Sequence, residues 1–358
     1  MTFPLNEKFS QGQPDQEPTR VGFGRGLVMA AEQDQRVVAL AADLAESIQM
    51  GPFVEKFPDR FVEVGIAEQN LVTVASGMAA MGMIPFAGSY AAFSPGRNWE
   101  QIRTTIALNN QPVKIVGSHA GLNVGPDGAT HQMLEDIALM RVLPNMVVIA
   151  PGDAIEAEKA TLAMAADPRP NYLRLARDKS PIFSTKDSPF AIGQAYVLRE
   201  GSDISLLGTG TMTAQNLLAA EILSQKNISV EVVHVPTIKP LDEATILASA
   251  RKTGHVITVE EHQIAGGFGS AVAELIFDGH PESTTRHPER SEGSLANTGD
   301  SSPSPELVRD QNDKLLFKRI GIQDQFGQSG SAAELLEHYG LTAEKIAAAA
   351  REFLRKTS

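Results

Sequence analysis

The sequence has no cysteine among its 358 residues. This excludes a disulfide framework, a thiolate nucleophile and a cysteine-ligated metal. Excess positive charge is also missing, because 31 Lys and Arg stand against 43 Asp and Glu, a formal charge of -12. An acidic chain has no general field that attracts nucleic acid or anionic membrane surfaces, so we expect neither as a partner. An anionic ligand would have to be held by a few local cations.

The N-terminal eighteen residues lack the basic and apolar segments of a signal peptide, so we expect a cytoplasmic protein. Between Glu68 and Arg97 the chain carries no charge, over a length that suggests a membrane span. Glycines and proline interrupt this stretch. It is therefore interpreted as a buried helix, a turn and a buried strand of a parallel sheet.

Hydrophobic residues make up 42% of the chain and charged residues 21%, which is enough for substantial cores. Short β-branched runs such as Arg36–Ala41 and Val113–Gly117 alternate with helical patterns such as Glu68–Met81. This alternation is typical of βαβ units. The predicted fold class is α/β, with two domains of mainly parallel sheets flanked by helices.

A Pro-, Ser- and Asp-containing segment, Lys179–Gly193, marks the boundary between the two domains. We predict the following division of the chain: a flexible N-terminal tail over 1–17, a first domain over 18–182, a linker over 183–193 and a second domain over 194–358. Residues 279–313 contain four residues from Ala, Val, Leu and Ile and no aromatic. Such a composition predicts a disordered insertion, because it cannot bury enough apolar area to offset ordering entropy.

The densest polar cluster, Ser118–Gln132, places His119 and His131 around a GPDG turn. It follows the predicted strand Val113–Gly117, and open α/β sheets bind ligands outside the carboxyl ends of their strands. The spacing fits no zinc pattern, so no metal site is predicted here. Imidazole rings and the carboxylate of Asp127 suit proton transfer and the binding of sugar hydroxyls. The alternative is a surface loop with two incidental histidines.

Glu68 precedes the uncharged stretch, where desolvation would disfavour its anion and make it a good partner for a protonated ring nitrogen. Alternatively, it is only a carboxylate placed favourably at a helix start. Tyr90 and Phe93 could line a flat pocket for an aromatic ring, or belong to the core.

Three arginines are candidate phosphate clamps, because guanidinium binds phosphate oxygens through two parallel hydrogen bonds. They are Arg20, Arg174 and Arg177. A single arginine is more often a solvated surface group. The run EEHQ at Glu260–Gln263 could be an interface or a ligand set, and the sequence leaves both open.

The motifs VGIAEQN, PFAGSYAAF and GSHAGLNVGPDGATHQ followed by LEDIALMR together resemble the thiamine-diphosphate-dependent transketolase family. The resemblance runs from about Pro18 to the C-terminus, outside 279–313. It covers the family's pyrimidine-binding domain and C-terminal domain. The diphosphate domain's GDG tripeptide does not occur. The chain thus resembles the C-terminal subunit of a split transketolase, whose N-terminal subunit would supply the missing domain and the ligands of Mg²⁺.

The resemblance implies cofactor contacts for four residues. Glu68 would hydrogen-bond the aminopyrimidine ring, where proton sharing favours the imino tautomer that removes the thiazolium C2 proton. Tyr90 and Phe93 would stack on the pyrimidine, and Asp43 would lie near the cofactor. A third family aromatic falls on Gly96. No metal ligand is expected from this chain.

The resemblance also implies a substrate site with two catalytic histidines, His119 and His131. Its substrate-binding residues would be Arg20, Ser47, His119, Asp127, His131 and Arg177. Two arginines and a serine would hold a sugar phosphate locally despite the acidic chain.

The implied function is transfer of a two-carbon ketol unit between a ketose phosphate and an aldose phosphate, in the pentose phosphate pathway, by a heterotetramer. Three alternatives stay open. They are a 1-deoxyxylulose-5-phosphate synthase, whose pattern places no histidine at His119, a 2-oxo acid dehydrogenase β subunit, and a non-catalytic transketolase-like interaction protein.

Overall fold

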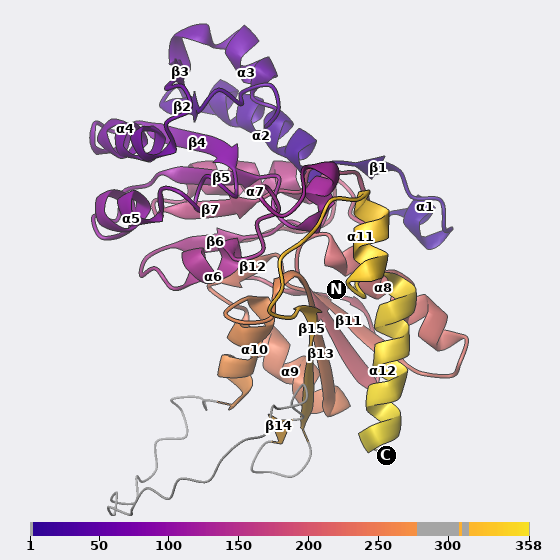
Figure 1. Ribbon diagram of the computed structural model, residues 1–358. Coiled ribbons are helices and arrows are strands. Elements are labelled where there is room, and N and C mark those ends of the chain that lie inside the picture. The colour runs from indigo at the N-terminus through magenta and orange to yellow at the C-terminus, as the bar shows by residue number, and fades with distance from the viewer. Residues whose placement is uncertain (1–2, 278–307, 310–314, 358) are drawn as a thin grey trace, which may run out of the picture.

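The computed structural model describes residues 3–277, 308–309 and 315–357, and contains two large sheets covered by helices (Figure 1). The predicted disordered insertion 279–313 lies outside the described residues except for Val308–Arg309. These two form the short strand β14. In the described part of the chain, no helix combines the length and the apolar character needed to cross a membrane.

The first sheet has seven strands in the order β12-β6-β7-β5-β4-β2-β3. Their bounds are β2 Val37–Ala41, β3 Phe61–Glu63, β4 Ile84–Tyr90, β5 Lys114–Ser118, β6 Val147–Ile149, β7 Asn171–Arg174 and β12 Thr237–Lys239. All pairings are parallel except β12 with β6. Strand β12 belongs to the predicted second domain, yet it pairs with the edge of the first sheet and satisfies backbone groups that β6 would otherwise leave open.

Helices cover both faces of this sheet, which is why β2 and β5 are buried along their whole length. One face carries α2 (Thr19–Gln33), α3 (Gly51–Lys56) and α7 (Ala154–Ala166). The other carries α4 (Glu68–Ala80), α5 (Trp99–Gln101), the π-helical η2 (Ile102–Ala107) and α6 (Asp136–Arg141). The uncharged stretch therefore forms α4 and β4, a helix and a strand as expected.

Close packing of α2 on α7 requires a glycine at position 22. A Cβ atom there would lie 1.8 Å from the carbonyl oxygen of Ala154. The small residue lets the two backbones approach and holds the start of α2, where Arg20 lies, against the sheet.

The second sheet has the order β14-β15-β13-β10-β11-β9. Its strands are β9 Tyr196–Arg199, β10 Ile204–Gly208, β11 Val230–His234, β13 His255–Gln263, β14 and β15 Leu316–Ile322. The four central strands pair in parallel, and β9 and β14 are antiparallel edges. Its helices are α8 Met212–Ser224, α9 Glu243–Thr253, α10 Phe268–Phe277, α11 Ala332–His338 and α12 Ala343–Thr357. The predicted fold class is confirmed.

The N-terminal residues differ from the expected flexible tail. Residues 3–17 pack on the body of the molecule through helix α1 (Glu7–Ser10) and strand β1 (Gln16–Glu17). Strand β1 pairs with β8 (Ser180–Pro181), and the rings of Phe3 and Phe9 are buried. Two buried apolar side chains and one strand pairing attach this polar segment to the rest of the chain.

Candidate functional site

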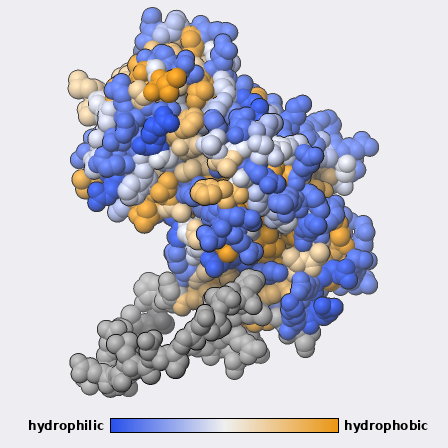
Figure 2. Space-filling model, in the orientation of Figure 1, coloured by the Kyte–Doolittle hydropathy of each residue, from blue (hydrophilic) through white to orange (hydrophobic). Residues whose placement is uncertain are grey.

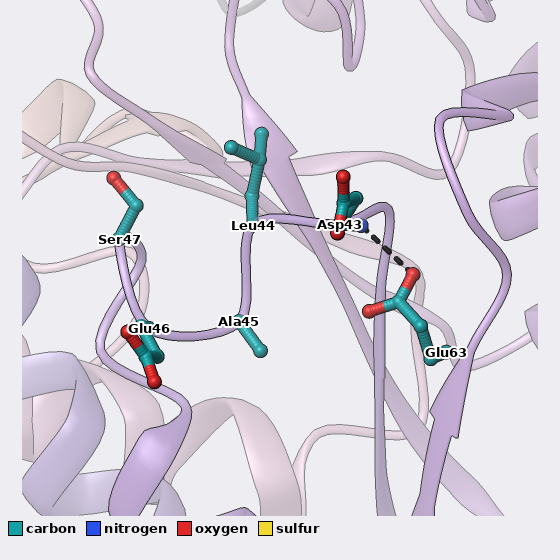
Figure 3. Close-up of a pocket in the computed structure, with 6 residues that line it drawn as sticks. All are labelled: Asp43, Leu44, Ala45, Glu46, Ser47 and Glu63. Carbon is teal, nitrogen blue, oxygen red and sulfur yellow. Dashed lines mark hydrogen bonds between the residues drawn. The ribbon is translucent and has the colours of Figure 1, made fainter.

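The candidate site lies where β2, β3, β4 and β5 end, at the carboxyl edge of the first sheet. Strands β2, β4 and β5 run directly into loops that carry polar or aromatic residues, and β3 is followed by the short loop that leads to Glu68. A cavity of about 630 Å³ opens beside the loop after β2 (Figure 3). It is lined by Asp43, Leu44, Ala45, Glu46, Ser47 and Glu63.

Glu63 holds the turn at Asp43 and was not predicted from the sequence. Asp43 adopts φ +59°, a left-handed conformation that aspartate tolerates better than most residues. One carboxylate oxygen of Glu63, Oε1, accepts from the backbone N–H of Asp43 at 2.8 Å (Figure 3). The same oxygen accepts from the backbone N–H of Gly65, also at 2.8 Å. The only signal in the sequence was an acid at the end of a predicted strand.

Four rings form a wall next to this loop. Tyr90, at the end of β4, stacks on His119, with ring centroids 3.8 Å apart and planes at 21°. Phe93 meets His131 edge-on at 5.4 Å. The structure therefore brings together both predicted histidines and both predicted aromatics, and we call this set the ring wall.

His119 is 2% exposed, and its Nδ1 lies 2.9 Å from the hydroxyl of Ser118. Burial, together with the nearby positive charges of Arg20 and Arg177, lowers the pKa of His119 to about 3. The ring is therefore neutral at neutral pH and can both donate and accept a hydrogen bond.

This lowered pKa predicts a pH effect on stability. The unfolded chain binds a proton at His119 below about 6.5, whereas the folded chain does not until about 3, so His119 makes folding less favourable as pH falls through that window. When the pH is lowered from about 7 to 5, the free energy of unfolding of the parent chain should fall by up to about 2 kcal/mol more than that of the His119→Asn variant. Urea denaturation at both pH values measures this, and equal losses would contradict the neutral ring.

Two guanidinium groups lie beside the ring wall. Arg20 donates through Nη1 to the carbonyl of Ser47 at 2.5 Å and through Nε to the carbonyl of Arg177 at 3.2 Å. The hydroxyl of Ser47 lies 2.6 Å from that of Tyr90. Burial and the charge of Arg177 lower the pKa of Arg20. Two like charges held this close favour a bound anion.

Arg174 is not part of this site. Its Nε donates to Asp136 at 2.9 Å, and its Nη2 donates to the carbonyl of Glu261 at 2.8 Å. The side chain is buried in this ion pair, so the third phosphate candidate has a structural role.

Glu68 is the first residue of α4 and is 1% exposed. Its carboxylate accepts from the hydroxyl of Ser89 at 3.1 Å and from Nη1 of Arg97 at 3.2 Å. The Arg97 guanidinium also lies 4.9 Å from the ring centroid of Phe93, so the carboxylate and the ring wall border one surface. A fixed acceptor beside aromatic faces suits a planar heterocycle with a ring nitrogen.

Two expected contributors add neither a ring nor a side-chain hydrogen bond to the ring wall in the described part of the chain. Asp127 is exposed on η3 (Leu122–Asp127), and no bond of the described residues joins it to the ring wall. At Gly96 a Cβ would lie 2.1 Å from the carbonyl oxygen of Ala92, so an aromatic side chain does not fit there without a backbone shift.

The EEHQ run lies on β13, against the first half of the chain. Glu260 accepts from the backbone N–H of Phe268 and Gly269 at the start of α10, and burial raises the pKa of Glu260 to about 7. Glu261 accepts from the backbone N–H of Asn123 at 2.7 Å. The run is thus an internal interface. Among the described residues, no group of three or more His, Asp or Glu side chains is arranged to hold a metal ion.

Comparison with family models gives two matches. Residues 16–181 match the model described as transketolase, pyrimidine binding domain. Residues 193–294 match the model described as transketolase, C-terminal domain.

Comparisons with individual proteins agree with the two family models. The chain is 41% identical over 339 residues to a Methanocaldococcus jannaschii protein named for the C-terminal section of transketolase, covering 94% of this chain and 96% of that one. It is 37% identical over 326 residues to a 6-deoxy-6-sulfo-D-fructose transketolase subunit of Clostridium sp., covering 91% of each. A solved structure described as a split gene transketolase, inactive β4 tetramer, superposes with TM-score 0.80 at 38% identity, over 95% of this chain and 99% of that one.

Proposed function

The chain belongs to the transketolase family, and from that premise we propose that it is the C-terminal subunit of a split transketolase that transfers a two-carbon ketol unit between sugar phosphates. An N-terminal subunit completes the site, and the two kinds of chain form a heterotetramer. The observation that carries the proposal is the common surface formed by the buried carboxylate of Glu68, the ring wall and the paired guanidiniums of Arg20 and Arg177.

The residues present fit the pyrimidine end of thiamine diphosphate. Glu68 offers a buried, oriented acceptor for a ring nitrogen, and Tyr90 and Phe93 offer aromatic faces next to it. Asp43 lies on the neighbouring loop. When bound, thiamine diphosphate supplies the nucleophilic carbon that accepts the two-carbon unit. Its diphosphate and Mg²⁺ are assigned to the partner subunit.

Glu68 holds a proton at the ring nitrogen of the cofactor. Ser89 and Arg97 fix the plane of its carboxylate. The carboxylate oxygen that shares the proton with the ring nitrogen is therefore held in one orientation. General acid–base groups held in this way contribute about 10²- to 10⁴-fold to turnover.

The histidines and arginines are assigned to the sugar. His119 is neutral, and stacking on Tyr90 fixes its ring plane, so Nε2 is left to exchange a hydrogen bond with a sugar hydroxyl. His131 and Asp127 contribute from the same loop. Arg20, Arg177 and Ser47 grip the charged end of the substrate. The Clostridium relative is named for a sulfo-sugar, and both a sulfo group and a phosphate are tetrahedral anions that this set can bind.

The test uses this chain mixed with its candidate N-terminal subunit, thiamine diphosphate and Mg²⁺. We expect transfer from xylulose 5-phosphate to ribose 5-phosphate, measured by the appearance of glyceraldehyde 3-phosphate. Activity on pyruvate and glyceraldehyde 3-phosphate in place of this reaction would assign the chain to the synthase.

A further inference from the structure

We propose that Asn123 and Glu261 are positioning residues for the anion-binding arginines, so that the C-terminal half of the chain determines how tightly the charged end of the substrate is held. This rests on the proposed function, which assigns Arg20 and Arg177 to that end. Neither Asn123 nor Glu261 lies in the ring wall.

Asn123 holds the backbone of Arg177. Its Oδ1 accepts from the backbone N–H of Arg177 at 2.7 Å and of Asp178 at 3.4 Å. The guanidinium of Arg177 donates through Nη1 to the carbonyl of Val124, the residue after Asn123, at 2.7 Å. Both ends of this arginine are therefore attached to the same loop segment.

Glu261 in turn holds Asn123. Its carboxylate is buried and accepts from the backbone N–H of Asn123 at 2.7 Å and from Nδ2 of Asn123 at 3.1 Å. The loop packs directly on this carboxylate, since a Cβ at Gly121, where φ is +88°, would lie 2.6 Å from Oε1 of Glu261. Because Nδ2 is committed to the carboxylate, the Oδ1 of Asn123 is turned toward Arg177.

The network continues from Arg177 to the cavity. The carbonyl of Arg177 accepts from Nε of Arg20, and Nη1 of Arg20 donates to the carbonyl of Ser47 on the loop after β2. Hydrogen bonds thus connect β13 of the second sheet with both arginines and with Ser47. Long charged side chains lose rotamer freedom when they bind an anion, and a scaffold that orders them beforehand reduces that cost.

The experiment measures KM and kcat in the reconstituted two-subunit enzyme for a ketose phosphate and for the same ketose without phosphate. The variants are Asn123→Ser, Arg177→Ala and their combination. Asn123→Ser should raise KM for the phosphorylated ketose about tenfold with kcat and the KM of the unphosphorylated ketose little changed. Added to Arg177→Ala, it should raise that KM no further, because Asn123 acts through Arg177.

Two further variants complete the test. Glu261→Gln presents an amide N–H₂ to the donors of Asn123 and should give the same selective rise, which keeps the test decisive if Asn123→Ser does not fold. Thr211→Val is the matched control, since Thr211 contacts the same carboxylate at 3.4 Å, outside the arginine loop, and should leave both KM values unchanged.

The outcomes separate the two proposals. If Arg177→Ala fails to raise KM selectively for the phosphorylated ketose, the assignment of the arginines to the anion is wrong. If Arg177→Ala is selective but Asn123→Ser and Glu261→Gln alter both KM values equally or neither, Asn123 and Glu261 have no positioning role.

Discussion

Replacing Glu68 with alanine should lower kcat of the reconstituted enzyme by about 10²- to 10⁴-fold, and replacing it with glutamine should cost nearly as much. The carboxylate is 1% exposed and is oriented by Ser89 and Arg97, so no water replaces it in the same geometry. Glutamine keeps the size of the side chain but cannot share a proton with a ring nitrogen. Steady-state assays of ketol transfer measure the loss.

A matched control is Glu55→Gln, which changes an exposed carboxylate on α3 and should retain the parent kcat. Thermal unfolding followed by circular dichroism separates a chemical defect from a folding defect. A Glu68→Ala variant that folds and turns over at the parent rate would eliminate the proton-sharing role.

The isolated chain should bind thiamine diphosphate weakly and show no ketol transfer, and adding the N-terminal subunit should restore both. In the proposed site this chain holds the pyrimidine end of the cofactor through Glu68, Tyr90 and Phe93, and the diphosphate and Mg²⁺ are assigned to the N-terminal subunit. A chain that binds only one end of a cofactor lacks the increase in affinity that comes from binding both ends at once. Calorimetry with cofactor and Mg²⁺, with and without the second subunit, measures the difference.

The surface of the chain agrees with a site completed from outside. Ile66 is 74% exposed although it lies two residues before the buried Glu68, and apolar residues interrupt the hydrophilic surface on the face shown in Figure 2. Tight, Mg²⁺-dependent cofactor binding by the isolated chain would refute the divided site. Chain kept without Mg²⁺ serves as the control for nonspecific binding.

The regular elements of the fold were predictable because burial leaves a pattern in the sequence. Strands such as β2 and β5 are covered on both faces and therefore read as continuous apolar runs. Glu68 and the two histidines were recognisable for a related reason, since polar groups stand out where a buried strand or an uncharged helix meets a loop.

Other features were not predictable. The composition of the N-terminal segment is that of a polar tail, yet Phe3 and Phe9 are buried in a hydrophobic cluster formed mainly by the second half of the chain. Strand β12 crosses to the first sheet although it lies beyond the predicted boundary. In both cases the contacts join residues far apart in sequence, which local composition does not encode.

The sequence by itself determined the α/β class, the resemblance to the family and most of the residues proposed for the candidate site, because these depend on local periodicity and on motifs. Only the tertiary structure decided that Arg174 is paired with Asp136 while Arg20 and Arg177 face the site, and that Glu63 holds the turn at Asp43. The physical reason is that the role of a charged group depends on its partners. Those partners come from distant segments and meet only when the sheets are formed.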